Sequence, residues 1–229
     1  MVIFVVGCGA TGSYYISTLA QLAIGNKCIE EIVLIDRDLV EVKNLKNQRF
    51  TKKDVGKSKA EVLAKRYSKL GIKISYVNDF ILSKDDIDRI YQSLDRTNSH
   101  LLIVSCVDNL QARYHINDYF NSKNDFEKLY YIDTGNDNNT KKGQTVLGYK
   151  EKEEVILKPV GDYFNLTEEE DKTEVSCSDI VVENPQHFTT NVISATTTFL
   201  ITSSILESNI EQLKNVFMFD GDKVSIKPF

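Results

Sequence analysis

The sequence predicts an α/β fold: a mostly parallel sheet with helices on both faces, to which the C-terminal third adds antiparallel strands. Three observations support it. Short apolar runs rich in β-branched residues alternate with helical patterns, which is the order of a parallel sheet. The first run ends in a glycine-rich turn that opens a helix. After Gln144 the pattern changes to strands of a different register and a closing hairpin.

The first 140 residues contain the repeated strand–helix order. Buried parallel strands read as unbroken apolar runs, and we expect them at Val2–Val6, Glu31–Ile35, Ile72–Val77, Leu101–Val104 and Leu129–Ile132. Apolar residues at spacings of three and four indicate helices. These are expected from Thr11 to about Gly25, at Val55–Leu70 and at Leu110–Phe120.

The C-terminal third is expected to complete the same domain, because no Pro/Ser-rich linker and no internal repeat divides the chain. We predict one domain over residues 1–229, with a nucleotide-binding part (1–140) and a part that completes the substrate or dimer surface (141–229). Its predicted elements are strands at Thr145–Tyr149 and Val155–Leu157, a helix at His187–Leu206, and a hairpin of Val216–Phe219 with Lys223–Ile226.

Composition narrows the class of protein. The 229 residues carry 28 Lys and Arg against 33 Asp and Glu, a formal net charge of −5, which disfavours broad nucleic-acid binding. No apolar run approaches the ~18 residues of a membrane span, and no basic segment precedes the first apolar run. The four cysteines form no CxxC pair, so we expect no zinc site and a reducing, cytoplasmic location.

A phosphate-binding loop follows the first strand. Gly7, Gly9 and Gly12 form a G-x-G-x-x-G pattern between a strand and a helix, the context in which backbone N–H groups and the helix dipole face an anion. Asp36 ends the next strand, where a carboxylate can bridge ribose hydroxyls. The pattern predicts a Rossmann-like nucleotide site; glycines serving only a tight turn are the alternative.

The residues after Asp36 point to a family. Two neighbouring motifs strongly resemble the ThiF/MoeB/ubiquitin-activating enzyme superfamily. They are the polar stretch Asp36-Arg-Asp38-Leu-Val-Glu-Val-Lys-Asn44-Leu-Lys-Asn47-Gln48-Arg49 and, after it, Asp54-Val-Gly-Lys-Ser-Lys59-Ala. The segment Ser105-Cys-Val-Asp108-Asn109 with Arg113 resembles the same superfamily. The segments Ile132–Asn136, Gly143–Gly148 and Ser176-Cys177-Ser178 with Gln186 and Asn191 resemble the ThiF-like proteins of bacterial PRTRC gene clusters.

The resemblance implies an ATP-dependent adenylyltransferase that activates the C-terminal carboxylate of a small ubiquitin-like or sulfur-carrier protein, as a homodimer. It assigns the phosphates to the glycine loop with Ala10 and Thr11, the ribose to Asp36, and Mg²⁺ to Asp108. Further ATP contacts fall to Asp38, Asn44, Gln48, Lys59 and Asn109. The alternatives are a solvated Lys59, a surface Asp38, and an Asp108 that caps the helix after it.

Two departures from the family motif leave other functions open. Asn47 stands where the family has arginine, so Arg49 must swing in or phosphate charge is handled less well. The chain also starts at its first strand, without the helical segment that relatives carry. A non-catalytic scaffold of the same fold is therefore the main alternative, and a nicotinamide-dependent oxidoreductase a third.

Cys177 is the one candidate for a thioester residue, because Cys8, Cys28 and Cys106 lie in the phosphate loop, a turn and a buried strand end. Its acidic neighbours Glu174 and Asp179 would raise its pKa, which opposes thiolate formation.

Overall fold

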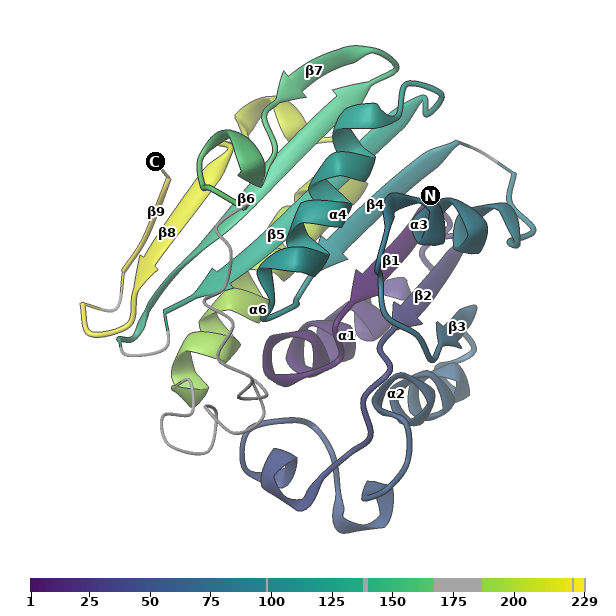
Figure 1. The fold of residues 1–229 in the computed structure, drawn as a ribbon, viewed down its shortest axis with the longest axis vertical. Coiled ribbons are helices and arrows are strands. Elements are labelled where there is room, and N and C mark those ends of the chain that lie inside the picture. The colour runs from purple at the N-terminus through teal and green to yellow at the C-terminus, as the bar shows by residue number, and fades with distance from the viewer. Residues whose placement is uncertain (98, 138–139, 167–186, 224, 229) are drawn as a thin grey trace.

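The computed structural model describes residues 1–97, 99–137, 140–166, 187–223 and 225–228. Within this part the chain forms one nine-stranded sheet of order β3-β2-β1-β4-β5-β6-β8-β9, with β7 paired to β6 (Figure 1). The strands are β1 (Val2–Val6), β2 (Glu31–Ile35), β3 (Ile74–Val77), β4 (His100–Ser105), β5 (Lys128–Asn136), β6 (Lys142–Glu151), β7 (Glu154–Leu157), β8 (Val216–Asp220) and β9 (Ser225–Pro228).

The sheet has a parallel and an antiparallel part. The neighbours from β3 to β5 are all parallel, and every pairing beyond β5 is antiparallel. The predicted fold class is confirmed. Strand order reverses at β1, whose neighbours are β2 and β4, and ligands of open α/β sheets bind at the carboxyl ends of the strands at such a point.

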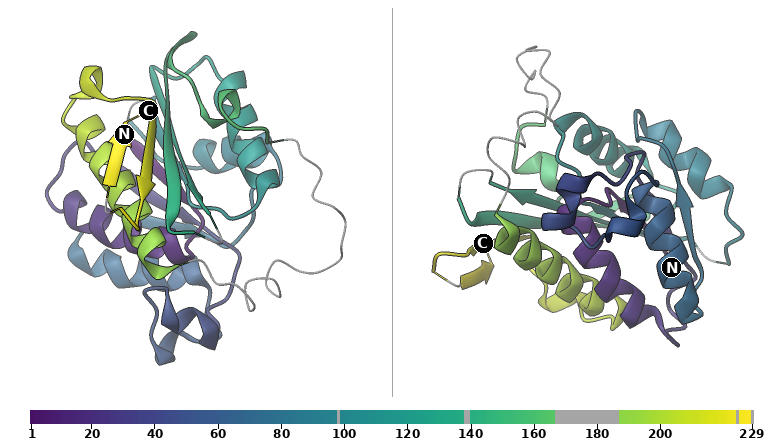
Figure 2. Two further views of the ribbon diagram at one scale, coloured as in Figure 1. Left: turned by 90° about the vertical axis from the view of Figure 1, so that its left-hand side faces the viewer. Right: turned by 90° about the horizontal axis from the view of Figure 1, so that it is seen from below.

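Helices cover both faces of the sheet. Helices α1 (Ala10–Ala23), α2 (Lys59–Tyr67) and α6 (Phe188–Leu206) lie on one face, and α3 (Lys84–Gln92) and α4 (Leu110–Ser122) lie on the other (Figures 1 and 2). Short 3₁₀ turns η1 (Val42–Lys46), η2 (Lys52–Asp54), η3 (Ser68–Leu70), η4 (Val160–Asp162) and η5 (Ile210–Gln212) join them. No described helix is both long and apolar enough to span a bilayer.

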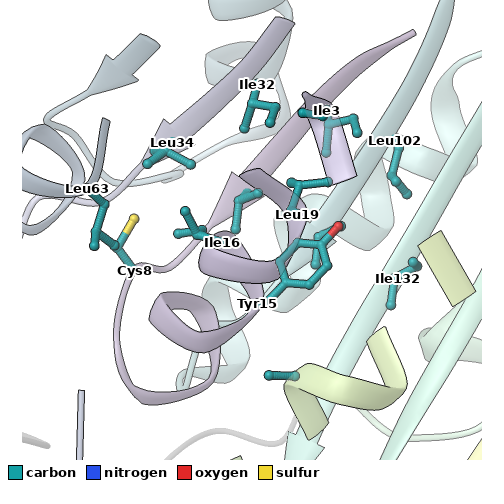
Figure 3. Packing of buried hydrophobic residues seen from close by; sticks show 14 of the residues in the cluster. Ile3, Cys8, Tyr15, Ile16, Leu19, Ile32, Leu34, Leu63, Leu102 and Ile132 are labelled. Atoms are coloured by element: carbon teal, nitrogen blue, oxygen red, sulfur yellow. The ribbon is translucent and has the colours of Figure 1, made fainter. Parts of the chain in front are cut away.

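Each face of the sheet has its own apolar core, because successive strand residues point to opposite sides. In β1, Ile3 and Val5 join the α1–α2–α6 core, whereas Phe4 and Val6 join the α3–α4 core. Figure 3 shows Tyr15 and neighbouring α1 side chains packed toward the strands of the first core. Helices therefore cover both faces, and the accessible parts of the parallel strands are their ends.

The structure corrects the predicted elements in several places. Helix α3 was not predicted: its sequence is mainly charged, and its signal is a capping box in which Ser83 and Asp86 bond reciprocally. The predicted helix at 55–70 begins only at Lys59, because Ser58 caps it. Strands β5 and β6 are longer than predicted, since they pair from Leu129–Lys150 to Asn136–Gly143, and the last strand runs over Ser225–Pro228.

Candidate nucleotide-binding site

The glycine loop lies between the carboxyl ends of β1 and β4. Gly7 has a φ of +92°, and a Cβ there would stand 2.7 Å from the carbonyl oxygen of Cys106. A Cβ on Gly12 would stand 2.0 Å from the carbonyl oxygen of Gly7. These two glycines are needed for the turn and for close packing of α1 on the loop.

Gly9 differs from Gly7 and Gly12. A Cβ on Gly9 would meet only the Gln48 amide nitrogen Nε2, at 3.9 Å, so the space above this backbone is open. Helix α1 begins at the next residue, and no side chain caps it. The first N–H groups of α1 therefore have no side-chain partner among the described residues, as an anion site requires. The Gln48 oxygen Oε1, at the edge of this space, is buried without a hydrogen-bond partner.

Asp36 is bound to the loop. Its carboxylate accepts the backbone N–H of Cys8 at 2.6 Å and that of Asp38 at 2.7 Å. It is 9% exposed, and burial raises its pKa. Each carboxylate oxygen retains lone pairs beyond these two bonds, so Asp36 can still accept ribose hydroxyls.

Lys59 is a buried cation beside this carboxylate. It is the first residue of α2, and its Nζ donates to Asp38 Oδ2 at 2.8 Å with only 8% of the side chain exposed. Burial disfavours the charged form, but the Asp36 carboxylate and the bond to Asp38 outweigh it and raise the pKa of Lys59. A solvated surface role for Lys59 is thus wrong.

The segment between Asp38 and Lys59 is folded by its own side chains. Asn44 is buried and its Oδ1 accepts the backbone N–H of Glu41, which closes η1. Arg49 is exposed: its backbone N–H donates to Ser13 Oγ, and its guanidinium carbon lies 5.2 Å from the centre of the Tyr14 ring. The structure thus places Arg49 against Ser13 and Tyr14 of α1.

Asp108 and Asn109 follow β4 on the other side of the loop. Asn109 caps α4, its side chain accepting the N–H of Ala112 at 2.8 Å, so the alternative in which Asp108 caps this helix is wrong. Asp108 is exposed and makes no hydrogen bond or ion pair with any described residue. A free carboxylate at the mouth of a phosphate loop suits Mg²⁺, which binds through one or two carboxylates plus substrate phosphates.

Arg113 holds this region together. Its Nη2 donates to the carbonyl oxygens of Val107 (3.1 Å) and Thr134 (2.5 Å), and its Nε lies 3.6 Å from the buried Asp133 carboxylate. It therefore ties the residue before Asp108 to the carboxyl end of β5.

The side chain of Thr11 makes long-range contacts that sequence reasoning missed. Its hydroxyl donates to Asn191 Oδ1 at 3.0 Å and accepts from Asn136 Nδ2, which also donates to Asn191. The three residues join α1, β5 and α6. No local pattern signals partners up to 180 positions apart.

Other expected or possible sites are not brought to this edge. Cys177 lies outside the described residues, and burial raises the pKa of the Cys106 thiol to about 12 and of the Cys8 thiol well above its ordinary value. No group of three His, Cys, Asp or Glu in the described part could hold a metal ion. Two cavities of about 420 and 820 Å³ lie by the amino ends of β4 and β5 and contain none of the predicted site residues.

Comparison with known proteins identifies the family of this chain. The ThiF family model matches residues 1–227, nearly the whole chain. The chain belongs to the ThiF family. The finer likeness to PRTRC-associated members stays a prediction.

Relatives of this ThiF protein include ubiquitin-like modifier-activating enzyme 5 of Drosophila ananassae and of Culex quinquefasciatus. Each is 32% identical, over 127 and 120 residues, covering 52% and 49% of this chain and 31% and 29% of the relative. The chain thus matches less than a third of these longer proteins.

Solved structures show the same fold. The microcin C7 biosynthetic enzyme MccB in complex with N-formylated MccA matches 99% of this chain and 63% of its own, with a TM-score of 0.69 and 18% identity. E. coli MccB with ATP matches with a TM-score of 0.63.

Proposed function

We propose that this ThiF-family chain binds ATP at the carboxyl edge of the sheet and adenylates the C-terminal carboxylate of a small ubiquitin-like or sulfur-carrier protein. The relatives are named as activating enzymes of ubiquitin-like modifiers, and MccB has been solved with ATP and with MccA. Both support the proposal at the level of reaction class. The identity of the substrate protein is not part of it.

In the proposed reaction, a carboxylate oxygen attacks the α-phosphorus of ATP. The bond between the α-phosphorus and the oxygen bridging to the β-phosphorus breaks, and pyrophosphate leaves with that electron pair. Both reactants are anions, so the site must hold them together and offset charge that grows on the phosphates.

This chain's residues fit those tasks. We assign the phosphates to the open backbone at Gly9 and the N–H groups of Ala10 and Thr11, and the ribose to Asp36. Asp108 would hold Mg²⁺, which would neutralise phosphate charge when bound. We assign further ATP contacts to Asn44, Gln48 and Asn109, and we assign Arg49 as a further cation for the phosphates. We also propose that the protein acts as a homodimer.

The observation that carries the proposal is Lys59. Lys59 is a buried ammonium that pairs with Asp38 near the Asp36 carboxylate and beside the open glycine loop, so it stays charged and is in place to meet an anion there. When a triphosphate binds, Lys59 can exchange its bond to the half-exposed Asp38 for a phosphate oxygen.

The test is substrate-dependent ATP–pyrophosphate exchange with Lys59→Ala and, as matched control, Lys57→Ala. Lys57 lies two residues away but is exposed. We expect Lys59→Ala to lower exchange by about 10²–10³-fold, the scale of a lost transition-state contact, and Lys57→Ala to change it less than about twofold. Equal effects of both variants would contradict the role of Lys59.

The scaffold alternative makes a different prediction. Calorimetry would then show partner binding that is indifferent to ATP, together with no exchange in the wild-type protein. Tight binding of NADH in place of ATP would instead favour the oxidoreductase.

A further inference from the structure

The segment Leu39–Lys57 forms a lobe that projects past the carboxyl ends of the parallel strands, between β2 and α2 (Figure 1). We call it the lysine lobe. Asp36 and Asp38 precede it and Lys59 follows it, so it flanks the proposed nucleotide site.

The lobe is strongly basic on an acidic protein. It contains six Lys and Arg against two acidic residues, whereas the whole chain carries −5. Both acids are engaged: Glu41 pairs with Lys43 at 3.2 Å, and Asp54 pairs with Arg66 of α2 at 2.8 Å. Lys46, Lys52 and Lys53 are exposed and make no hydrogen bond or ion pair within the described structure. Their charges are available to a partner.

Exposed apolar side chains accompany these lysines. Leu39, Val42 and Val55 are 54%, 70% and 37% exposed on the same segment. A mixture of apolar area and free cations is suited to a protein surface of opposite charge. Single-stranded nucleic acid would call for exposed aromatic rings as well, and the lobe's one aromatic residue, Phe50, is buried.

The lobe is also preformed, so binding would cost little ordering. Val40 donates its N–H to the Lys57 carbonyl and accepts that of Gly56, while Leu39 bridges to Ser58. Asp54 closes η2 by accepting both the N–H and the hydroxyl of Thr51.

We propose that the lysine lobe is the docking surface for an acidic face on the protein whose C-terminal tail enters the site. This inference rests on the proposed function and adds the chemistry of its partner. Attraction between the two surfaces would orient the tail toward the carboxyl edge before any specific contact forms.

The test compares two triple variants of equal charge change. The first variant combines Lys46→Glu, Lys52→Glu and Lys53→Glu and reverses the charge of the lobe's three unpaired lysines. Lys27→Glu, Lys69→Glu and Lys214→Glu together reverse the charge of three exposed lysines outside the lobe, next to the start of β2, the end of α2 and the start of β8. The probes are two short fluorescent peptides ending in a free Gly-Gly carboxylate, one with a run of Glu upstream and one with Gln in its place.

At about 50 mM salt, we expect the wild-type protein to bind the Glu peptide about tenfold more tightly than the Gln peptide, and the preference to shrink as salt screens it. The lobe variant should lose this preference while it still binds ATP, and the control variant should keep the preference. Equal losses in both triple variants, or no loss in the lobe variant, would overturn the inference.

Two further outcomes identify other occupants and also overturn it. One is tighter binding of a dT oligonucleotide that the lobe variant alone loses; the other is a change of oligomeric state confined to that variant. Failure of the wild-type protein to bind ATP would count against the proposed function instead. The preference for the Glu peptide is measured without ATP, so the two failures can be told apart.

Discussion

At the scale of single residues, the three glycines of the loop after β1 differ in what an added Cβ would meet. Backbone oxygens stand within 3 Å of a Cβ on Gly7 or Gly12, whereas almost nothing stands near one on Gly9. Gly7 and Gly12 are therefore required by the fold, and Gly9 by whatever approaches the backbone from outside.

This difference gives opposite expectations for two alanine variants. Gly12→Ala should lower the free energy of unfolding by roughly 1–3 kcal/mol or more, because its Cβ overlaps a backbone oxygen. Gly9→Ala should unfold like the wild-type protein in urea but weaken ATP binding about tenfold or more in calorimetry, because its methyl fills the space of a phosphate. Normal ATP affinity in Gly9→Ala would contradict the assignment of the phosphates to this loop.

Asp54 makes stability depend on pH. Burial alone would raise its pKa, but hydrogen bonds from Thr51 and the charge of Arg66 outweigh burial and lower it. A carboxyl whose pKa is lower in the folded state stabilises the fold above its unfolded pKa of about 3.9, and the effect is lost as pH falls through the folded value.

Asp54→Asn should therefore cost about 1–2 kcal/mol of unfolding free energy at pH 7. The gap to the wild-type protein should close as pH falls below about 3.9, measured by urea unfolding along a pH series. Asp95→Asn, at an exposed carboxylate, is the control. A gap that stayed constant down to low pH would show that the carboxylate charge is irrelevant.

At the scale of elements, the site is assembled where β1, β4 and β5 end, and side chains of the next helices fix the geometry. Arg113 of α4 bonds the residue before Asp108 to β5, and Thr11 of α1 bonds to both β5 and α6. Side chains of neighbouring helices and strands thus fix the loops that would contact nucleotide, rather than contacts within the loops themselves.

Arg113→Met tests this dependence. It removes two hydrogen bonds and leaves the buried Asp133 without its cation, so we expect a loss of roughly 2–4 kcal/mol in stability. We also expect faster amide exchange at residues 106–109 and a higher Mg²⁺ requirement for ATP binding.

Arg89→Met, on the exposed face of α3, is the matched control. Adding Asp133→Asn to Arg113→Met should recover the part of the stability that was lost through the unpaired Asp133 carboxylate, but it should not restore the wild-type Mg²⁺ requirement. Recovery of both would mean that Arg113 only neutralises Asp133.

At the scale of the whole molecule, the C-terminal third continues the sheet that the N-terminal part begins. Strand β6 pairs with β5 from Leu129 to Asn136, and α6 packs on α1. Leu147, Ala195, Ile201 and Ile205 belong to the same core cluster as Ile3 and Leu19. We therefore expect the two parts divided at residue 140 to have different roles but to fold as one unit.

A fragment of residues 1–140 should accordingly fail to form a stable monomer, because it exposes the edge of β5 and the α6-facing side of the core. Size-exclusion chromatography and amide exchange would detect aggregation or loss of protection. A fragment of residues 1–220, which lacks only the edge strand β9, should stay folded. A well-folded 1–140 fragment would instead establish two independent domains.

The sequence by itself determined the features that depend on neighbouring residues. Apolar runs placed the strands, the spacing of Gly7, Gly9 and Gly12 placed the phosphate loop, and Asp36 followed from the end of the second strand. It failed at α3, where charged residues hide a helix whose few apolar side chains suffice because α4 packs against it.

Only the tertiary structure decided which side chains meet. That Lys59 is buried between Asp36 and Asp38, that Asn109 rather than Asp108 caps α4, and that Arg113 reaches Thr134 depend on how separate elements pack. The physical reason is that local patterns encode conformation, whereas the charge state and partners of a side chain follow from burial and from residues distant in the chain.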